Sequence, residues 1–261
     1  MKKNLTAVLF FLVSLLVCSC SKIVFTNGEP VTESRPVAHY FTAICVYNNI
    51  NVRLIQSEQP RLELTCPKNL IDNVITEVSG DTLIIRNDNT FNWIRSYDYS
   101  IDLTVYYNKL REINYASIGD LVCTDSISGV EGQYFDTTES GIDTLSVRGL
   151  DLNINEGSGH IDLTTNCERI VCKFSNGTSD VILRGQVGYS EYLTRSYGVI
   201  HAENLNSNLT HVQSTSTNDV YVWTRSQLTV WLYSIGNVYY KGDPEIVIED
   251  CTSEGRVIRM E

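Results

Sequence analysis

A turn followed by a short strand recurs along this chain at nearly constant spacing. In each unit, small polar residues are followed by a stretch with apolar residues at every second position, as in "GSGHIDLTT", "TSDVILRGQ" and "TNDVYVWTR". The first apolar residues after each turn are Leu121, Ile142, Ile161, Val181, Ile200, Val220, Val238 and Val257, at intervals of 18 to 21 residues. A constant period of about 20 residues is typical of stacked repeats, none of which can bury its apolar face alone.

Each period holds two apolar stretches with the alternation of a strand, joined by small residues such as Gly157, Ser158 and Gly159 that favour tight turns. The sequence therefore predicts an all-β fold, with a β-solenoid of about 19-residue rungs over residues 115–261. The register is weakest at Ile142, where "LSVRG" fits a strand as well as "IDTLS". An antiparallel sandwich is the alternative, although it would not require a constant period.

Residues 37–114 also alternate with period two, as in "LELTC" and "IDLTVYY", but no 19-residue repeat is visible there. They predict a β layer with longer strands that starts the stack. Within this layer, residues 69–78 fit either a turn or one or two turns of helix. Residues 20–36 hold two of the five prolines and little periodicity, which indicates a tether.

The N-terminus has the features of an export signal. Lys2 and Lys3 precede an apolar run over residues 5–17, which is too short to span a bilayer. The run leads into "VCSC", which resembles the bacterial lipoprotein signal, with a small residue just before Cys20. We therefore expect residues 1–19 to be a signal peptide and Cys20 to carry the lipids that anchor the protein to a membrane. An ordinary secretory signal is the alternative.

Charge and motif content exclude several classes of function. The formal net charge is -11, which argues against nucleic acid as a partner, because binding it requires a basic face. The four histidines lack metal-ligand spacing, and there is no Cys-x-x-Cys and no Gly-x-Ser-x-Gly. The sequence thus predicts neither a metal site nor a cofactor.

From residue 37 to 261 the chain resembles the head GIN domain of Bacteroidetes auto-transporter adhesins. The resemblance rests on "FTAICVYNNINVRLIQ" and "RLELTCPKNLIDNVITEVSGDTLIIRN", then on "SIGNVYYKGDPEIVIEDCTSEGRVIRM". The family's typical turn is Ser-Gly-Ser-Gly-Asp before an aliphatic residue, and here His160 and Asn237 stand in the Asp place. The resemblance implies an extended all-β lipoprotein of the cell envelope, at the outer membrane, and it supplies no catalytic residues.

Aromatic residues near the C-terminal end are predicted to face solvent. If Val220, Val222 and Val238 fill the core, period-two alternation turns their neighbours outward. We expect these neighbours to form an exposed face that binds a glycan or an envelope protein: Tyr221, Trp223, Trp231, Tyr233 and Tyr239. The alternative is that they only stabilise the sheet by packing across strands.

The alternative function is that of a carbohydrate-active enzyme. The repeat assigns Asp143 and Asp162 to neighbouring rungs, about 5 Å apart, which is the carboxylate separation of a retaining glycosidase. Two solvated surface aspartates are the simpler interpretation of the pair.

Two further expectations concern modification and redox state. Four tripeptides resemble the Bacteroidetes O-glycosylation motif and make candidates of Thr82, Ser126, Thr137 and Thr144. Six cysteines follow the lipoprotein signal, and several alternate with core residues. We expect mostly free buried thiols rather than disulfides.

Overall fold

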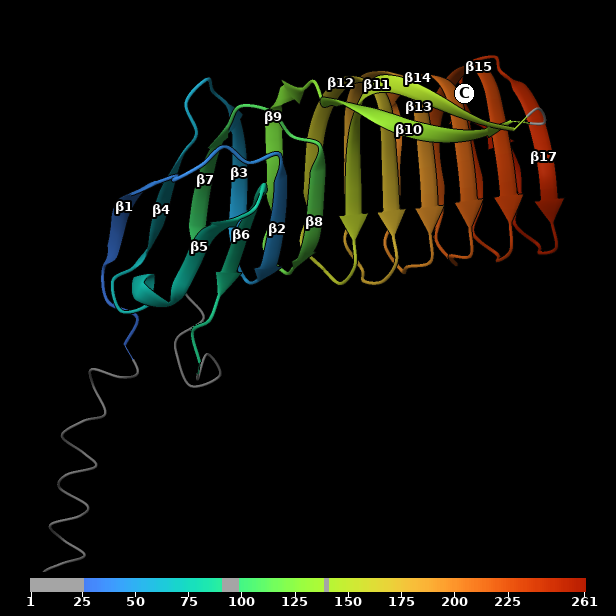
Figure 1. Ribbon diagram of the computed structural model, residues 1–261. Helices are drawn as coiled ribbons and strands as arrows, with labels where there is room; N and C mark the ends of the chain where they lie inside the picture. The colour runs from blue at the N-terminus through green and yellow to red at the C-terminus, as the bar shows by residue number, and fades with distance from the viewer. Residues whose placement is uncertain (1–25, 91–98, 139–140) are drawn as a thin grey trace, which may run out of the picture.

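The strands stack into a rod with two faces, which we call sheet 1 and sheet 2 (Figure 1). The computed structural model describes residues 26–90, 99–138 and 141–261, without the side chains of residues 134–145. These residues form 18 strands and one 3-10 turn. The all-β solenoid expected from the repeat is confirmed.

Sheet 1 contains, in spatial order, β1 (Pro30–Pro36), β4 (Arg61–Pro67), β7 (Asp102–Tyr107), β3 (Asn51–Gln56), β9 (Leu121–Ile127), the first halves of β12 (Ile161–Phe174), β13 (Val181–Thr194), β14 (Ile200–Ser214) and β15 (Val220–Leu232), then β16 (Val238–Lys241) and β18 (Val257–Arg259). Sheet 2 contains β5 (Val74–Ser79), β6 (Thr82–Asn87), β2 (Ala43–Asn48), β8 (Glu112–Ser117), the second halves of β11 (Gly141–Ile154) and of β12 to β15, and β17 (Glu245–Cys251).

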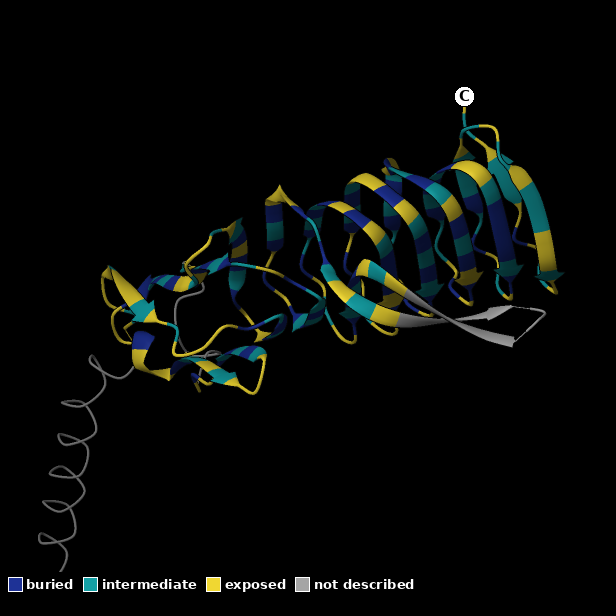
Figure 2. Ribbon diagram, turned by 45° about the horizontal axis from the view of Figure 1, so that its top comes forward, coloured by how far each residue is buried: buried dark blue, intermediate teal, exposed yellow. Residues whose placement is uncertain are grey.

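One interior column runs along sheet 1 through the repeats. Val181, Ile200, Val220 and Val238 pair rung to rung, and each is at most 1% exposed. Figure 2 shows the alternation of buried and less buried residues along these strands. The predicted core column is confirmed, because a residue every 18 to 20 positions returns to the same place on the next rung.

The long strands of the repeats bend from sheet 1 into sheet 2 without a break. At the bend of β13, Gly185 has a φ of +112°, and a Cβ there would lie 2.0 Å from the carbonyl oxygen of Thr165 on the previous rung. Because they continue through the bend, β12 to β15 are 13 to 15 residues long, whereas β2 to β8 have six or seven residues. The expectation of longer strands in the N-terminal half is wrong, because there the chain leaves the strand conformation between the sheets, as at residues 108–111.

The assignment of a rung to Ile142 is also wrong. Leu121 pairs directly with Ile161, so the rungs that they begin are neighbours in space. The chain between them makes an antiparallel hairpin from β10 (Val130–Thr138) and the first part of β11, which lies along the rod in Figure 1. This insertion has the length of about one rung, so it preserved the spacing in the sequence without contributing a layer.

The N-terminal half belongs to the same stack. The pair β2–β3 lies between β6–β7 on one side and β8–β9 on the other, all in parallel register. The rungs of this half are thus adjacent in space but out of order in the sequence, which is why no repeat is visible there. Residues 69–78 form a 3-10 turn at Ile71–Asn73, and β5 follows it.

Within the described residues there is neither a membrane-spanning helix nor a disulfide. None of their helices has the length and apolar character needed to cross a membrane. All six of their cysteines are free thiols; Cys66, Cys123, Cys167 and Cys172 are buried, and Cys251 is exposed.

Candidate functional site: the outer face of sheet 1

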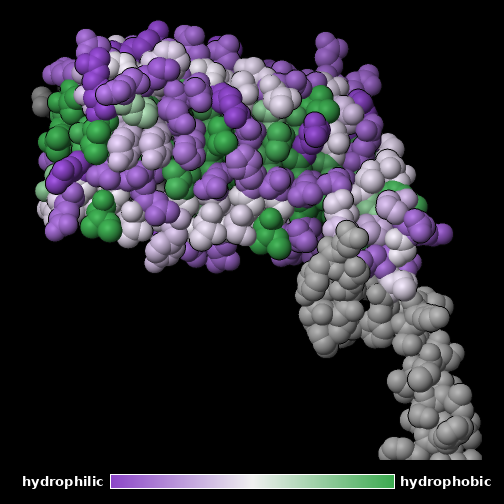
Figure 3. Space-filling view, turned by 180° about the vertical axis from the view of Figure 1, so that it is seen from behind, coloured by the Kyte–Doolittle hydropathy of each residue, from purple (hydrophilic) through white to green (hydrophobic). Residues whose placement is uncertain are grey.

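A column of outward side chains follows the interior column of sheet 1 along the rod. The first apolar residue after each turn points into the core, so the next residue points to solvent. All members of the column are half-buried, and they are Val122, Asp162, Ile182, His201, Tyr221, Tyr239 and Ile258. Sheet 1 lies at the back of Figure 1, and the view from behind shows small groups of hydrophobic residues among hydrophilic ones (Figure 3).

Three rings of this column stack on one another. The ring centroids of His201 and Tyr221 are 5.1 Å apart at an interplanar angle of 6°, and those of Tyr221 and Tyr239 are 5.0 Å apart at 11°. Stacked rings cover each other's flat faces, so this row presents ring edges, hydroxyl groups and ring nitrogens to solvent. Both flat faces of Tyr221 are therefore covered, and His201 and Tyr239 each have one face covered by the Tyr221 ring. Partial burial, and then the carboxylate of Asp219, raise the pKa of Tyr221.

Trp223 lies two residues beyond Tyr221 on the same side of β15. The ammonium group of Lys241 on β16 lies 4.3 Å from the centroid of the Trp223 ring. A cation over an indole ring is attracted by the electrons of the ring face. The charged lysine therefore covers one face of the indole and adds a positive group to the aromatic row.

Trp231 and Tyr233 do not share this face. Trp231 lies in the second half of β15, in sheet 2, where its ring meets that of His211 edge-on at 5.8 Å. Tyr233 follows the end of β15 and is 39% exposed. The single five-residue face predicted from the sequence is wrong, because β15 bends from one sheet into the other between Trp223 and Trp231.

The predicted carboxylate pair is also wrong. Asp143 lies opposite Asp136 in the β10–β11 hairpin, whereas Asp162 on β12 lies between Val122 and Ile182 in sheet 1. The carboxylate of Asp162 instead accepts a hydrogen bond from the guanidinium of Arg184. The described residues also contain no group of three or more His, Cys, Asp or Glu side chains placed to hold a metal ion.

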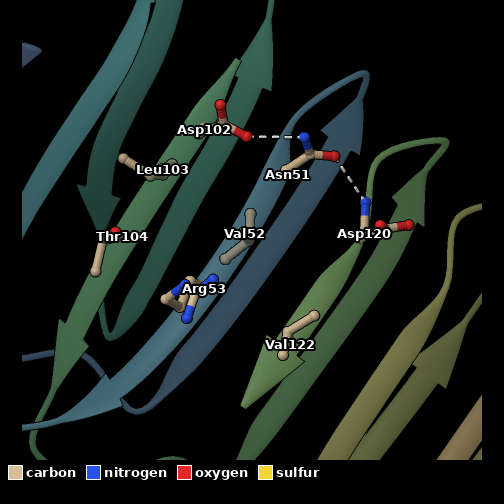
Figure 4. A pocket seen from close by; sticks show the side chains of 8 residues that line it. All are labelled: Asn51, Val52, Arg53, Asp102, Leu103, Thr104, Asp120 and Val122. Atoms are coloured by element: carbon tan, nitrogen blue, oxygen red, sulfur yellow. Dashed lines mark hydrogen bonds between the residues drawn. The ribbon is translucent and has the colours of Figure 1, made fainter. Parts of the chain in front are cut away.

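A shallow depression of about 280 Å³ lies on the same face, nearer the N-terminal end of the rod (Figure 4). Asn51 joins three rungs there. Its amide donates to the carboxylate of Asp102 at 2.8 Å, and its carbonyl accepts from the backbone amide of Asp120 at 3.0 Å. Arg53 and Val122 also line the depression. Sequence analysis missed these residues, because the rungs that carry them are not consecutive in the chain.

The remaining predicted sites are surface or undescribed positions. Ser126 is exposed in β9, and Thr82 is half-buried at the start of β6. Cys20 lies outside the described residues, as do the side chains of Thr137 and Thr144.

Comparison with known proteins identifies the family. The family described as "Putative auto-transporter adhesin, head GIN domain" matches residues 40–244. The chain belongs to this family. Membership of the head GIN family indicates an adhesin-like protein of the cell envelope or cell surface. A search of curated proteins finds no match.

Solved structures share the fold of this head GIN domain. A protein named a putative adhesin, from Bacteroides fragilis, is 18% identical with a TM-score of 0.76, and the alignment covers 90% of this chain and all of that one. A protein named a putative lipid binding protein, from Parabacteroides distasonis, is 19% identical with a TM-score of 0.61, over 90% of this chain and 98% of that one. A protein named a putative adhesin, from the same species, is 16% identical with a TM-score of 0.59, over 90% and 99%.

Proposed function

We propose that this head GIN protein is a lipid-anchored protein of the outer membrane that binds a glycan or an envelope protein through the outer face of sheet 1. Cys20 would carry the lipids, and the chain between it and β1 would serve as a tether. This tether is shorter than the expected residues 20–36, because residues 30–36 form β1 and pair with β4. The family supports an adhesin-like role, and the signal at residues 1–20 supports the anchor. β1 lies at one end of the rod, and the other rungs extend from that end (Figure 1).

The row formed by His201, Tyr221 and Tyr239 carries the binding proposal. It presents one polar ring edge per rung, and rungs are about 4.8 Å apart. A linear polymer lying along the rod would meet a hydrogen-bonding group at every rung. Trp223 and Lys241, beside this row, add apolar contact and a positive charge. These features favour an extended glycan over a compact small molecule, which would need a deeper pocket.

Removal of the hydroxyl groups tests the binding proposal. Tyr221→Phe and Tyr239→Phe keep the stacked rings but delete the groups that face solvent. On a glycan array, we expect the double variant to lose the ligands that the unaltered protein binds, at unchanged melting temperature. Trp231→Phe on sheet 2 is the control and should bind normally. Equal binding by the double variant would contradict the proposal.

Replacement of the acylated cysteine tests the anchor separately. Cys20→Ala removes the thiol that would be acylated, so an unprocessed or unlipidated precursor should accumulate, without incorporation of labelled fatty acid. Cys18→Ala is the matched control and should be processed and labelled normally. Equal processing and labelling of Cys20→Ala and the unaltered protein would rule out the lipoprotein assignment.

The enzymatic alternative has lost the feature that suggested it. Asp162 is bound to Arg184, and Asp143 lies in the inserted hairpin, so the two carboxylates do not form a pair. Of the glycosylation candidates, Ser126 is the better placed because it is exposed, whereas Thr82 is half-buried. We propose Ser126 as a modified residue, and mass spectrometry of the protein from its native host tests this.

A further inference from the structure

The C-terminal end of the rod leaves core-facing side chains uncovered. Ile248 in β17 stands where Val230 stands one rung earlier, yet Ile248 is 55% exposed and Val230 is fully buried. Ile246 and Val257, also at core positions of this rung, are only half-buried. At the other end, where β1 continues the sheet beyond β4, Leu64 of β4 is fully buried. Solenoids require a cap over such an end to remain soluble.

The last rung also has free backbone groups. Among the described strands, β17 pairs only with β15, and β18 pairs only with β16. The carbonyl of Arg256 and the amide of Met260 bond to β16, so the alternation of a parallel ladder directs the groups of Val257 and Arg259 outward. An open edge of this kind is a template for pairing with another strand.

The two ends differ in how their edges are protected. β1, the outermost strand of sheet 1 at the N-terminal end, begins at Pro30 and ends at Pro36. Proline lacks the amide hydrogen that pairing needs, so it blocks an edge. β17 and β18 contain no proline. Of the two edges of sheet 1, the one at the C-terminal rung is therefore the more favourable for pairing with another chain.

The charges of the last rung indicate which partner chain would pair with it. β17 is acidic, with Glu245, Glu249 and Asp250, whereas β18 is flanked by Arg256 and ends at Arg259. A second copy can meet this end in two symmetric ways. One pairs β18 with β18 and β17 with β17, which sets like charges opposite each other. The other pairs β18 with β17, which sets opposite charges together and is the favourable arrangement.

We propose that two copies of this chain associate end to end through the C-terminal rung, with β18 of each copy antiparallel to β17 of its partner. Both sheets would continue across the junction, and the core ends around Ile246, Ile248 and Val257 would cover each other. β1 lies at the opposite end of the rod, so it does not cover this rung (Figure 1). The association does not involve the outer face of sheet 1, so it is independent of ligand binding.

Charge exchange tests the arrangement. In sedimentation equilibrium of the full chain in detergent micelles, we expect a monomer–dimer equilibrium. Arg259→Glu places a carboxylate opposite the acidic side chains of β17 at both symmetric contacts. It should therefore weaken the dimer about tenfold. Glu249→Arg should weaken it similarly, and the two changes combined should restore it. Stronger association of Arg259→Glu alone would overturn the pairing of β18 with β17.

A second pair of variants tests the apolar contact. Ile248→Lys places a charge at the junction, whereas Ile118→Lys changes a residue of similar exposure, 62%, in the turn between β8 and β9. Because both isoleucines are already exposed, both variants should keep the melting temperature of the unaltered monomer. Only Ile248→Lys should abolish the dimer. A protein that stays monomeric up to about 200 µM, or equal loss of dimer in both variants, would overturn the proposal.

Discussion

The carboxylate of Asp120 accepts a hydrogen bond from the backbone amide of His160, at 2.9 Å, and the two residues hold the same turn position on neighbouring rungs. Asp219 accepts from the amide of Asn237 at 2.8 Å, and Asn237 accepts from the amide of Arg256 at 3.0 Å. An acceptor at this turn position therefore joins successive rungs. Asn237, in place of the family's aspartate, keeps this role, whereas the described structure contains no such bond from the His160 ring.

The first prediction concerns this ladder of turn residues. Asp120→Ala removes an acceptor and should lower the free energy of unfolding by about 1 kcal/mol. Asp120→Asn keeps an oxygen in the same place, as Asn51 and Asn237 do, so it should cost less. Urea denaturation of the two variants checks the difference. Equal stability of Asp120→Ala and the unaltered protein would mean that the bond contributes nothing.

The second prediction concerns the interior column. Val220 is 1% exposed between Ile200 and Val238. Val220→Asp would bury an unpaired carboxylate among apolar side chains and should cost about 3 kcal/mol or more. Val222→Thr, two residues along the strand, is a milder polar control at another buried site. A melting temperature for Val220→Asp within a few degrees of the unaltered protein would contradict the assignment of this column to the core.

The third prediction concerns the bend between the sheets. Gly185→Ala introduces a Cβ 2.0 Å from the carbonyl oxygen of Thr165 at a φ of +112°, so it should cost about 3 kcal/mol. Gly80 has a φ of +62° with open space around it, so Gly80→Ala isolates the backbone contribution and should cost about 1 kcal/mol. Thermal unfolding of both variants measures the difference. Equal losses would show that rung contact at the bend is unimportant.

The fourth prediction concerns alkaline pH. Burial raises the pKa of the Cys172 thiol to about 12, and it raises the pKa of the Tyr115 hydroxyl to about 12 as well. In the unfolded chain a thiol ionises near pH 8.5, so the stabilising effect is complete below that pH. Above it the unfolded state loses protons that the folded state keeps, so stability falls as pH rises toward 12.

Urea midpoints between pH 7 and pH 11 test this pH dependence. We expect the midpoint to fall continuously above about pH 9. Cys172→Ala is the control: it lowers stability overall, but it should make the fall with pH less steep. A midpoint that does not change up to pH 11 would contradict the burial of these groups.

The fifth prediction concerns thiol reactivity. Cys251 is exposed, while Cys66, Cys123, Cys167 and Cys172 are buried. Burial also raises the pKa of Cys66 and of Cys123 to about 11, which further reduces their thiolate fraction. Alkylation of the folded protein at pH 8 should therefore label Cys251 first, and labelling in urea should reach all of these residues. Rapid labelling of Cys172 in the folded state would contradict the packing.

The sequence by itself determined the rung of the solenoid. The spacing of Val181, Ile200, Val220 and Val238 fixed which residues stack, because a constant period returns each residue to the same place in the next layer. Alternation also determined which side chains of a strand point inward. Both are local properties of the chain, so they can be read from residue order alone.

Only the tertiary structure decided which layers are neighbours and which strand halves share a face. Residues 37–114 stack out of sequence order, and the β10–β11 hairpin imitates a rung without forming one. Trp223 and Trp231 belong to one strand but lie in different sheets, because the strand bends between them. Spacing along a chain does not show where a strand bends into the other sheet or where the chain leaves the stack. The predicted aromatic face and the predicted carboxylate pair could therefore be corrected only with the folded structure.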